Sequence, residues 1–240
     1  AGSALYLEDD FPKAKALLEA GVRSAPTHPA IRNFQAIYLG EVEGRIDSAI
    51  AVARRATELD MATIFLNTLG DQYMRNRQYD SAIAVLRRAI DLDPGVSGPR
   101  LRLITSYERT GKFAEAVAAR RAWRGEDGVA PFESGFKSGG AAGYRAALEA
   151  ELRLRADSLK GQIGGPRLYP RDTLPLIPEA RLAMLYGQLG DWKTATDWVL
   201  REHQLRPRRL VLWVRHPDMQ GLRTDPRFVA LVREAGLQAR

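Results

Sequence analysis

The side chains best suited to catalysis or metal binding are three histidines, and their spacing argues against both. His28, His203 and His216 are far apart in the sequence, and none has a second histidine or a carboxylate at metal-ligand spacing on one helix face. Metal ligands and general bases need partners within the same site. The 240 residues include no cysteine, which excludes a thiol nucleophile, a Cys-based zinc site and an iron-sulfur cluster. We therefore expect no metal and no cofactor.

Glycines and paired carboxylates are the other candidates for chemistry. The run Gly139-Gly140-Ala-Ala-Gly143 precedes an expected helix, where backbone N–H groups can hold a phosphate. It has no preceding strand and no lysine, so we interpret it as a helix-start loop. The pairs Asp9-Asp10 and Glu149/Glu151 lie on exposed or adjacent faces, and we expect solvated charge there. The sequence contains no Gly-x-Ser-x-Gly elbow, and it predicts a protein that is not an enzyme.

A repeat organises the elements that carry these residues. The segment Asp47-Ser-Ala-Ile-Ala-Val-Ala-Arg-Arg-Ala-Thr-Glu-Leu-Asp60 returns 33 residues later as Asp80-Ser-Ala-Ile-Ala-Val-Leu-Arg-Arg-Ala-Ile-Asp-Leu-Asp93. Looser copies begin at Phe11 and Phe113. A period near 34 residues that is built from two helices indicates a stack of helical hairpins.

The clearest hairpin spans residues 63–96. Small residues at Gly70 and Ala82 allow its two helices to approach closely, and Tyr73 fills the space beside them. Pro94 ends the second helix because its ring interrupts the hydrogen-bond ladder. This pattern of glycine, tyrosine, alanine and proline resembles the tetratricopeptide repeat (TPR). The first copy lacks its opening helix, so we expect the repeats to begin upstream of Ala1 or to fray there.

The rest of the chain departs from this period and then returns to it. Glycines recur through residues 124–140 and predict an irregular stretch. The pattern of residues 141–160 predicts one helix, and a Gly/Pro loop follows. The TPR resemblance implies an all-α, right-handed solenoid of antiparallel helix pairs, with an irregular helical insert and a C-terminal capping helix. We expect one continuous solenoid that divides into N-terminal hairpins (1–123), insert and loop (124–178), a further hairpin (179–207) and a cap (208–240).

The C-terminal cap has its own signals. Asp225 or Thr224 can cap a helix whose first turn holds Pro226, and Gly236 can end it. The sequence Leu222-Arg-Thr-Asp-Pro-Arg-Phe228 resembles the Leu-Arg-x-Asp-Pro-Arg-Phe ending of bacterial regulators with a C-terminal TPR module. These include Ser/Thr kinases, nucleotide cyclases and winged-helix activators. The resemblance implies a non-catalytic scaffold for protein-protein interaction, either a sensing or assembly module or an accessory subunit of a larger bacterial complex.

Stacked hairpins expose the first helix of each pair on their concave side. Aromatic and methionine side chains among polar ones suit a peptide, a helix or a subunit of a larger assembly. The alternative is that the aromatic residues are core and the others are ordinary surface. The groove candidates are Phe34, Tyr38, Glu41, Asn67, Asp71, Met74, Leu101, Arg102, Thr105 and Glu108.

Charge offers a second hypothesis. The chain carries 36 Lys plus Arg against 29 Asp plus Glu, a net charge of +7, and residues 198–240 are especially basic. Six arginines recur with the repeat, and the period predicts an outward-facing basic ladder able to bind a polyanion or an anionic membrane surface. Nearby carboxylates can neutralise it, and no aromatic residues interleave with it as single-stranded nucleic acid requires. The ladder comprises Arg54, Arg55, Arg87, Arg88, Arg120 and Arg121.

The sequence leaves the compartment open. No apolar run approaches the roughly 18 residues of a membrane span, and residues 1–10 do not read as a signal peptide. Membrane contact would be peripheral or through an upstream anchor, and the chain would lie in the bacterial cytoplasm or on the extracytoplasmic side. The oligomeric state is equally open.

Overall fold

The computed structural model describes residues 1–6, 8–161, 163 and 178–237. Most of the expected Gly/Pro loop lies outside these residues. The described residues form helices joined by turns and contain no strand. Helices adjacent in sequence pack as pairs, which is the all-α architecture of a TPR-type solenoid.

The chain forms two compact units, one of residues 16–148 and one of residues 1–15 together with 149–240. We describe each by itself; our division of the chain into four segments stays a prediction. A short helix precedes the first repeat-like helix, where the sequence pattern showed none. The helices are α1 (Gly2–Tyr6), α2 (Phe11–Ser24), α3 (Pro29–Glu41), α4 (Ile46–Leu59), α5 (Thr63–Arg75), α6 (Tyr79–Leu92), α7 (Ser97–Arg109) and α8 (Phe113–Lys160).

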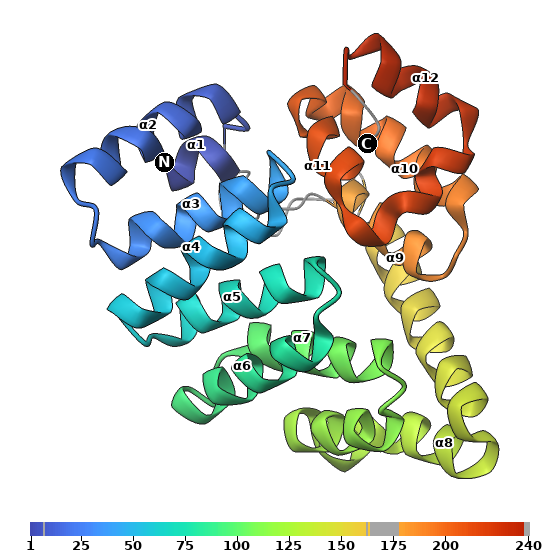
Figure 1. Cartoon of the computed structure of the whole chain (residues 1–240). Helices are drawn as coiled ribbons and strands as arrows, with labels where there is room; N and C mark the ends of the chain where they lie inside the picture. The colour runs from blue at the N-terminus through green and yellow to red at the C-terminus, as the bar shows by residue number, and fades with distance from the viewer. Residues whose placement is uncertain (7, 162, 164–177, 238–240) are drawn as a thin grey trace. The chain divides into compact units, whose positions relative to one another are not determined.

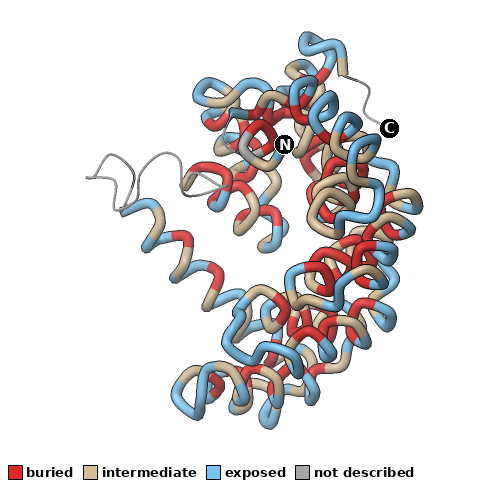
Figure 2. The backbone as a smooth tube through the Cα atoms, turned by 90° about the vertical axis from the view of Figure 1, so that its left-hand side faces the viewer, coloured by how far each residue is buried: buried red, intermediate tan, exposed pale blue. Residues whose placement is uncertain are grey.

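In the unit of residues 16–148, α3 to α7 stack as successive hairpins (Figure 1). Their apolar residues are buried along the sides that face neighbouring helices (Figure 2). The expected close approach at Gly70 is confirmed, since a Cβ atom there would lie 2.6 Å from Leu86 Cδ2. Ala82 is fully buried and Tyr73 is 8% exposed. Small residues thus set the spacing between paired helices, and larger ones fill the core.

The turn inside each hairpin needs a left-handed backbone. Gly44 has φ 69° and Gly111 has φ 73°, and Gly190 plays the same part in a later hairpin with φ 75°. The corresponding position between α5 and α6 is Arg77, whose φ is 58°. Glycine adopts this region without a steric penalty, whereas a residue with a Cβ does not. The hairpin of α5 and α6 therefore has a strained turn, which the hairpins α3–α4 and α7–α8 lack.

The glycine-rich stretch that we expected to be loose is helical. It lies within α8, which is broken where Gly125 (φ 72°) and Gly140 (φ 55°) leave helical geometry. A Cβ atom on Gly135 or Gly143 would collide with the backbone of the other. These two glycines allow residues 126–139 to cross closely against the next helical segment, so they serve helix packing and not loop flexibility.

The second unit contains another hairpin and the cap. Its core includes Ala183, Val199, Trp213 and Phe228. The elements are α9 (Pro178–Gln188), α10 (Trp192–Leu205), the 3-10 helix η1 (Pro207–Arg209), α11 (Leu210–Arg215), the 3-10 helix η2 (Pro217–Thr224) and α12 (Pro226–Glu234).

The expected N-terminal cap of the last helix is confirmed, and the structure shows which of the two candidate residues forms it. Asp225 Oδ1 accepts a hydrogen bond from the backbone N–H of Arg227 at 2.9 Å. Thr224 instead donates its hydroxyl to the Gly221 carbonyl at 2.7 Å. Pro226 begins α12, and Gly236 follows it with φ 66°. The helix buries Phe228 and Val232 against the second unit's core.

One carboxylate pair is not solvated as we expected. Asp9 is 6% exposed and lies in the second unit among arginines of η1 and its N-terminal flank. Its Oδ2 atom is 2.5 Å from Arg206 Nε and its Oδ1 atom 3.3 Å from Arg209 Nη1. Two adjacent acidic residues give no sequence signal for a basic partner about 200 positions away. The pairs Glu149–Arg153 (2.7 Å) and Glu151–Arg155 (3.2 Å) lie along α8.

Candidate partner-binding face

The first helices α3, α5 and α7 are joined by one chain of ion pairs. Arg75 on α5 donates to Glu41 on α3 at 3.1 Å and to Asp71 at 2.9 Å. Asp71 also accepts from Arg102 on α7 at 3.0 Å. The structure thus brings together three of the expected groove residues, Glu41, Asp71 and Arg102. The surface formed by α3, α5 and α7 is called the first-helix face below.

Asp71 is the centre of this network. Burial would raise the pKa of its carboxyl, but the charges of Arg102 and Arg75 outweigh burial and hold the pKa below its usual value. Asp71 is therefore ionised at neutral pH. Arg75 was absent from our candidates although it follows Asp71 by four residues, the spacing of a helical ion pair. That spacing was the signal that could have found it.

A second network surrounds Glu108. Its Oε1 atom accepts from Arg120 Nη2 and from the Tyr144 hydroxyl, both at 2.8 Å. Arg120 also donates to Tyr144 Oη at 2.8 Å and lies 3.7 Å from the centre of the Phe132 ring. Burial and the Glu108 carboxylate raise the pKa of Tyr144, so its hydroxyl remains protonated. Glu108 thus links α7 to two segments of α8.

The remaining groove candidates differ in exposure. Tyr38 is buried at 7% exposure, which fits the core alternative better than a contact with a ligand. Phe34 and Met74 are partly buried, and Met74 packs against the core. Thr105 donates its hydroxyl to the Leu101 carbonyl at 3.0 Å. Asn67 is partly buried, and its Oδ1 atom has no hydrogen-bond partner among the described residues.

Exposed apolar side chains lie at the N-terminal ends of α5 and α7, the helices that carry the charged networks. Leu101 is 45% exposed, as a binding residue requires, and Ile64, which our candidates omitted, is 57% exposed. Ile64 precedes Asp71 by seven residues and Leu101 precedes Glu108 by seven, so each pair lies on one side of its helix. The first turns of α5 and α7 thus present large apolar side chains on the same helices that carry the charged networks.

Four members of the arginine ladder, Arg54, Arg55, Arg87 and Arg88, are exposed as the period predicted, but Arg120 is not. The first arginine of each pair is bonded to a tyrosine: Arg54 to Tyr73 and Arg87 to Tyr107, both at 2.9 Å, and Arg120 to Tyr144. Arg120 is only 5% exposed, so its placement on an outer surface was wrong. Sequence spacing alone cannot show which way a side chain turns once a tyrosine hydroxyl is within reach.

The second arginines of these pairs are exposed to different degrees. Arg55 is 2.8 Å from Glu58, which confirms the expected neutralisation. Arg121 lies 3.0 Å from Glu126 and 2.7 Å from Glu133. Arg88 is exposed. Much of the predicted ladder is therefore engaged within the protein.

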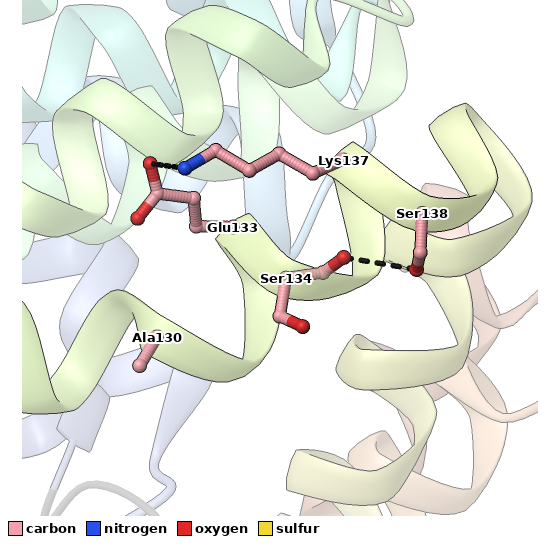
Figure 3. Close-up of a pocket in the computed structure, with 5 residues that line it drawn as sticks. All are labelled: Ala130, Glu133, Ser134, Lys137 and Ser138. Carbon is pink, nitrogen blue, oxygen red and sulfur yellow. Dashed lines mark hydrogen bonds and ion pairs between the residues drawn. The ribbon is translucent and has the colours of Figure 1, made fainter.

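A hollow of about 470 Å³ lies beside residues 126–139 of α8 (Figure 3). Its lining includes Glu133 and Lys137, which pair at 2.9 Å, and Ser138, which donates to the Ser134 carbonyl at 2.9 Å. These polar groups bond to one another across the lining. In the part of the chain that the structure describes, no three histidine or carboxylate side chains are grouped to hold a metal ion.

In comparisons with known proteins by sequence and by structure, one family profile agrees with the helical repeat. A tetratricopeptide-repeat family profile matches residues 73–127, which run from the end of α5 into α8. No curated protein sequence matches the chain. Among solved structures, the Naa15/Naa10 complex bound to HypK-THB contains a chain that aligns with 96% of this one at 16% identity and a TM-score of 0.45. The alignment spans 34% of that chain, about a third of its length.

The described residues thus form an all-α solenoid of helical hairpins, of which residues 73–127 match the tetratricopeptide-repeat profile. Across the described ranges, no helix is both long enough and apolar enough to cross a membrane.

Proposed function

We propose that this protein is a non-catalytic scaffold that holds a segment of a partner protein on the first-helix face. The observation that carries the proposal is the arrangement of α5 and α7, where exposed Ile64 and Leu101 stand two helical turns from ionic networks. An apolar patch bordered by charged groups is the usual composition of a protein interface. A partner helix or extended peptide with apolar side chains at one end fits this face.

The ion-pair network supports the proposal in a second way. Glu41, Arg75, Asp71 and Arg102 connect three successive first helices and restrict their side chains before a partner arrives. A surface that is already ordered loses less conformational entropy on binding. The polyanion alternative lacks a comparable observation, because the first arginine of each ladder pair is bonded to a tyrosine.

The resemblance of the C-terminal sequence to bacterial regulators supports a more specific role. We propose that the scaffold serves as a sensing or assembly module, or as an accessory subunit, of a larger bacterial complex. TPR arrays occur with many unrelated catalytic and regulatory parts, so the fold does not choose between these roles.

A matched pair of double variants tests the face. Ile64→Asp/Leu101→Asp places charge on it, whereas Leu154→Asp/Leu205→Asp makes the same change at two residues of the other unit that are 72% and 55% exposed. Tagged versions of each are purified from native cells together with the wild type. We expect a stoichiometric partner with the wild type and the control, and loss of that partner with the first variant. Equal recovery from all three would contradict the proposal.

A further inference from the structure

Large apolar side chains are exposed where α4 is followed by α5 and where α6 is followed by α7. Met61 and Ile64 lie in the first of these segments, and Leu92 and Val96 lie in the second. Each of the four is between 37% and 57% exposed. Single apolar residues are common on protein surfaces, whereas a group of them marks an interaction site. These four residues are called the turn patch below.

The start of α5 lies beside the end of α6. Thr63, which stands between Met61 and Ile64, donates its hydroxyl to the Ala89 carbonyl at 3.4 Å. Ala89 is three residues before Leu92, the last residue of α6. The two halves of the turn patch are therefore neighbours on one surface.

The start of α7 lies on the other side of the start of α5. A Cβ atom on Gly98 would be 3.5 Å from the Asn67 side chain, so these two residues are in contact. Ile64 is three residues before Asn67, and Val96 is two residues before Gly98. The turn patch therefore continues the first-helix face at its N-terminal end, where the two surfaces share Ile64.

Three aspartates border the turn patch. Asp60 and Asp93 are the C-terminal caps of α4 and α6, and Asp91 lies in the last turn of α6. All three are exposed, and none pairs with a cation among the described residues. The last carbonyl groups of a helix carry partial negative charge, so a carboxylate is unfavourable there. These three residues, called the turn aspartates, thus hold negative charge without a local counter-charge.

The arginines nearby are engaged elsewhere or stand apart. Arg55 pairs with Glu58 at 2.8 Å. Arg100 donates from Nε and Nη2 to the Pro94 carbonyl, at 3.0 and 2.8 Å. Arg88 is exposed on α6 and pairs with no carboxylate in the part of the chain that the structure describes. A cation from outside the chain would therefore find the turn aspartates available.

We propose that the partner segment held on the first-helix face is amphipathic and basic. Its apolar side chains cover the turn patch, and its lysine or arginine side chains pair with the turn aspartates. The net charge of +7 repels basic segments in general. Such a segment therefore binds where apolar contact and local negative charge occur together. This inference rests on the function proposed above and specifies the chemistry of the partner.

The test uses the full chain and two fluorescein-labelled helical peptides that share the same leucine face. One peptide carries lysine at its polar positions, and the other carries glutamate. We expect the lysine peptide to bind at least about tenfold more tightly, and its binding to weaken as the salt concentration rises. A lysine peptide that does not bind, or a glutamate peptide that binds equally well, would overturn the proposal.

Two triple variants test the charges. The first replaces the turn aspartates by asparagine, which keeps an acceptor oxygen at each position, and should weaken binding of the lysine peptide at least about tenfold. The control removes three exposed charges from α2 and α8 and should bind as the wild type does. Equal weakening in both would indicate general charge attraction and contradict the proposal. The variants are Asp60→Asn/Asp91→Asn/Asp93→Asn and Glu19→Gln/Glu115→Gln/Asp127→Asn.

The apolar contact has its own pair of variants. Met61→Ser/Leu92→Ser should also weaken binding of the lysine peptide at least about tenfold, whereas Leu17→Ser/Leu154→Ser, at exposed residues outside the turn patch, should not. Circular dichroism checks that every variant keeps its helicity. A wild-type dimer that Met61→Ser/Leu92→Ser dissociates in sedimentation would overturn the proposal, because a second copy of the chain would then cover the patch.

Recovery of the native partner separates this proposal from the proposed function. We expect both the asparagine triple variant and Ile64→Asp/Leu101→Asp to lose the partner. If only Ile64→Asp/Leu101→Asp lost it, the first-helix face would bind a partner that is not basic, and the present proposal alone would be wrong. If Ile64→Asp/Leu101→Asp recovered the partner in full, the proposed function would fail and this proposal with it.

Discussion

Arg87 Nε donates a hydrogen bond to Tyr107 Oη at 2.9 Å and thereby joins the second helix of one hairpin to the first helix of the next. The same pairing joins Arg54 on α4 to Tyr73 on α5. Arg120 forms the third such bond, but its partner Tyr144 comes from a later segment of α8. The recurring arginines therefore hold successive hairpins together, and a lost tyrosine hydroxyl should weaken the stack.

We expect Tyr144→Phe to destabilise the protein more than Tyr107→Phe. Tyr144 Oη bonds to both Arg120 and Glu108, and Arg120 is buried, so its loss leaves charged groups short of a partner. The cost should be about 2–3 kcal/mol, against about 1 kcal/mol for Tyr107, whose partner Arg87 is exposed and can bond to water. Urea unfolding followed by circular dichroism measures both.

Tyr79→Phe is the control for this comparison. Tyr79 is partly buried at the start of α6, and its hydroxyl makes none of the bonds that join hairpins in the described part of the chain. Its loss should change the free energy of unfolding by no more than about 0.5 kcal/mol. A Tyr144→Phe variant as stable as this control would show that the bond does not support the stack.

The sequence predicted the hairpins well because they repeat. The small residues at Gly70 and Ala82 and the cap of the last helix depend on neighbours close in sequence, and each is confirmed. Helicity between Gly125 and Gly140 was missed because glycine lowers helix propensity, whereas here Gly135 and Gly143 are required for close backbone contact. A propensity does not reveal which other helix will pack against a residue.

The site was predicted less completely for a related reason. The period correctly placed Asp71 and Arg102 on first helices, but it could not show that Arg75 joins Asp71 to Glu41. It also placed Arg120 outside, although its side chain turns inward to Phe132 and Tyr144. Side-chain direction depends on partners that the insert supplies, and the insert departs from the repeat. The contact of Asp9 with Arg206 has no local signal at all.

A substitution at Arg77, the residue in the left-handed turn, should stabilise the protein, whereas the tyrosine substitutions should destabilise it. Gly44 and Gly111 occupy the corresponding positions, so Arg77→Gly should relieve strain and raise the free energy of unfolding by about 0.5–1 kcal/mol, after the entropy cost of glycine in the unfolded chain. Thermal unfolding measures the gain. Gly111→Ala, the reverse change at the next turn, should lower stability by about 1 kcal/mol. A less stable Arg77→Gly variant would mean that the arginine side chain stabilises the turn by more than its strain.

The charge on Asp71 should make the network on the first-helix face sensitive to acid. Because its pKa is lowered in the folded protein, the ionised carboxyl contributes stability above the ordinary aspartate pKa of 3.8. That contribution is lost as the pH falls below this value toward the lowered pKa. Asp71→Asn should therefore cost about 2 kcal/mol at pH 7, since it removes charged hydrogen bonds to Arg75 and Arg102.

The difference between Asp71→Asn and the wild type should shrink when urea midpoints are compared at pH 7 and below pH 3. Asp80→Asn is the matched control, because the Asp80 side chain is 81% exposed and pairs with Lys112 on the surface. An exposed pair contributes at most about 1 kcal/mol. Its variant should lie close to the wild type at both pH values. If Asp71→Asn also showed a small difference that did not change with pH, the carboxyl would not be held ionised by its two arginines. The first-helix face would then lack the preorganised charge on which the proposed binding of a partner depends.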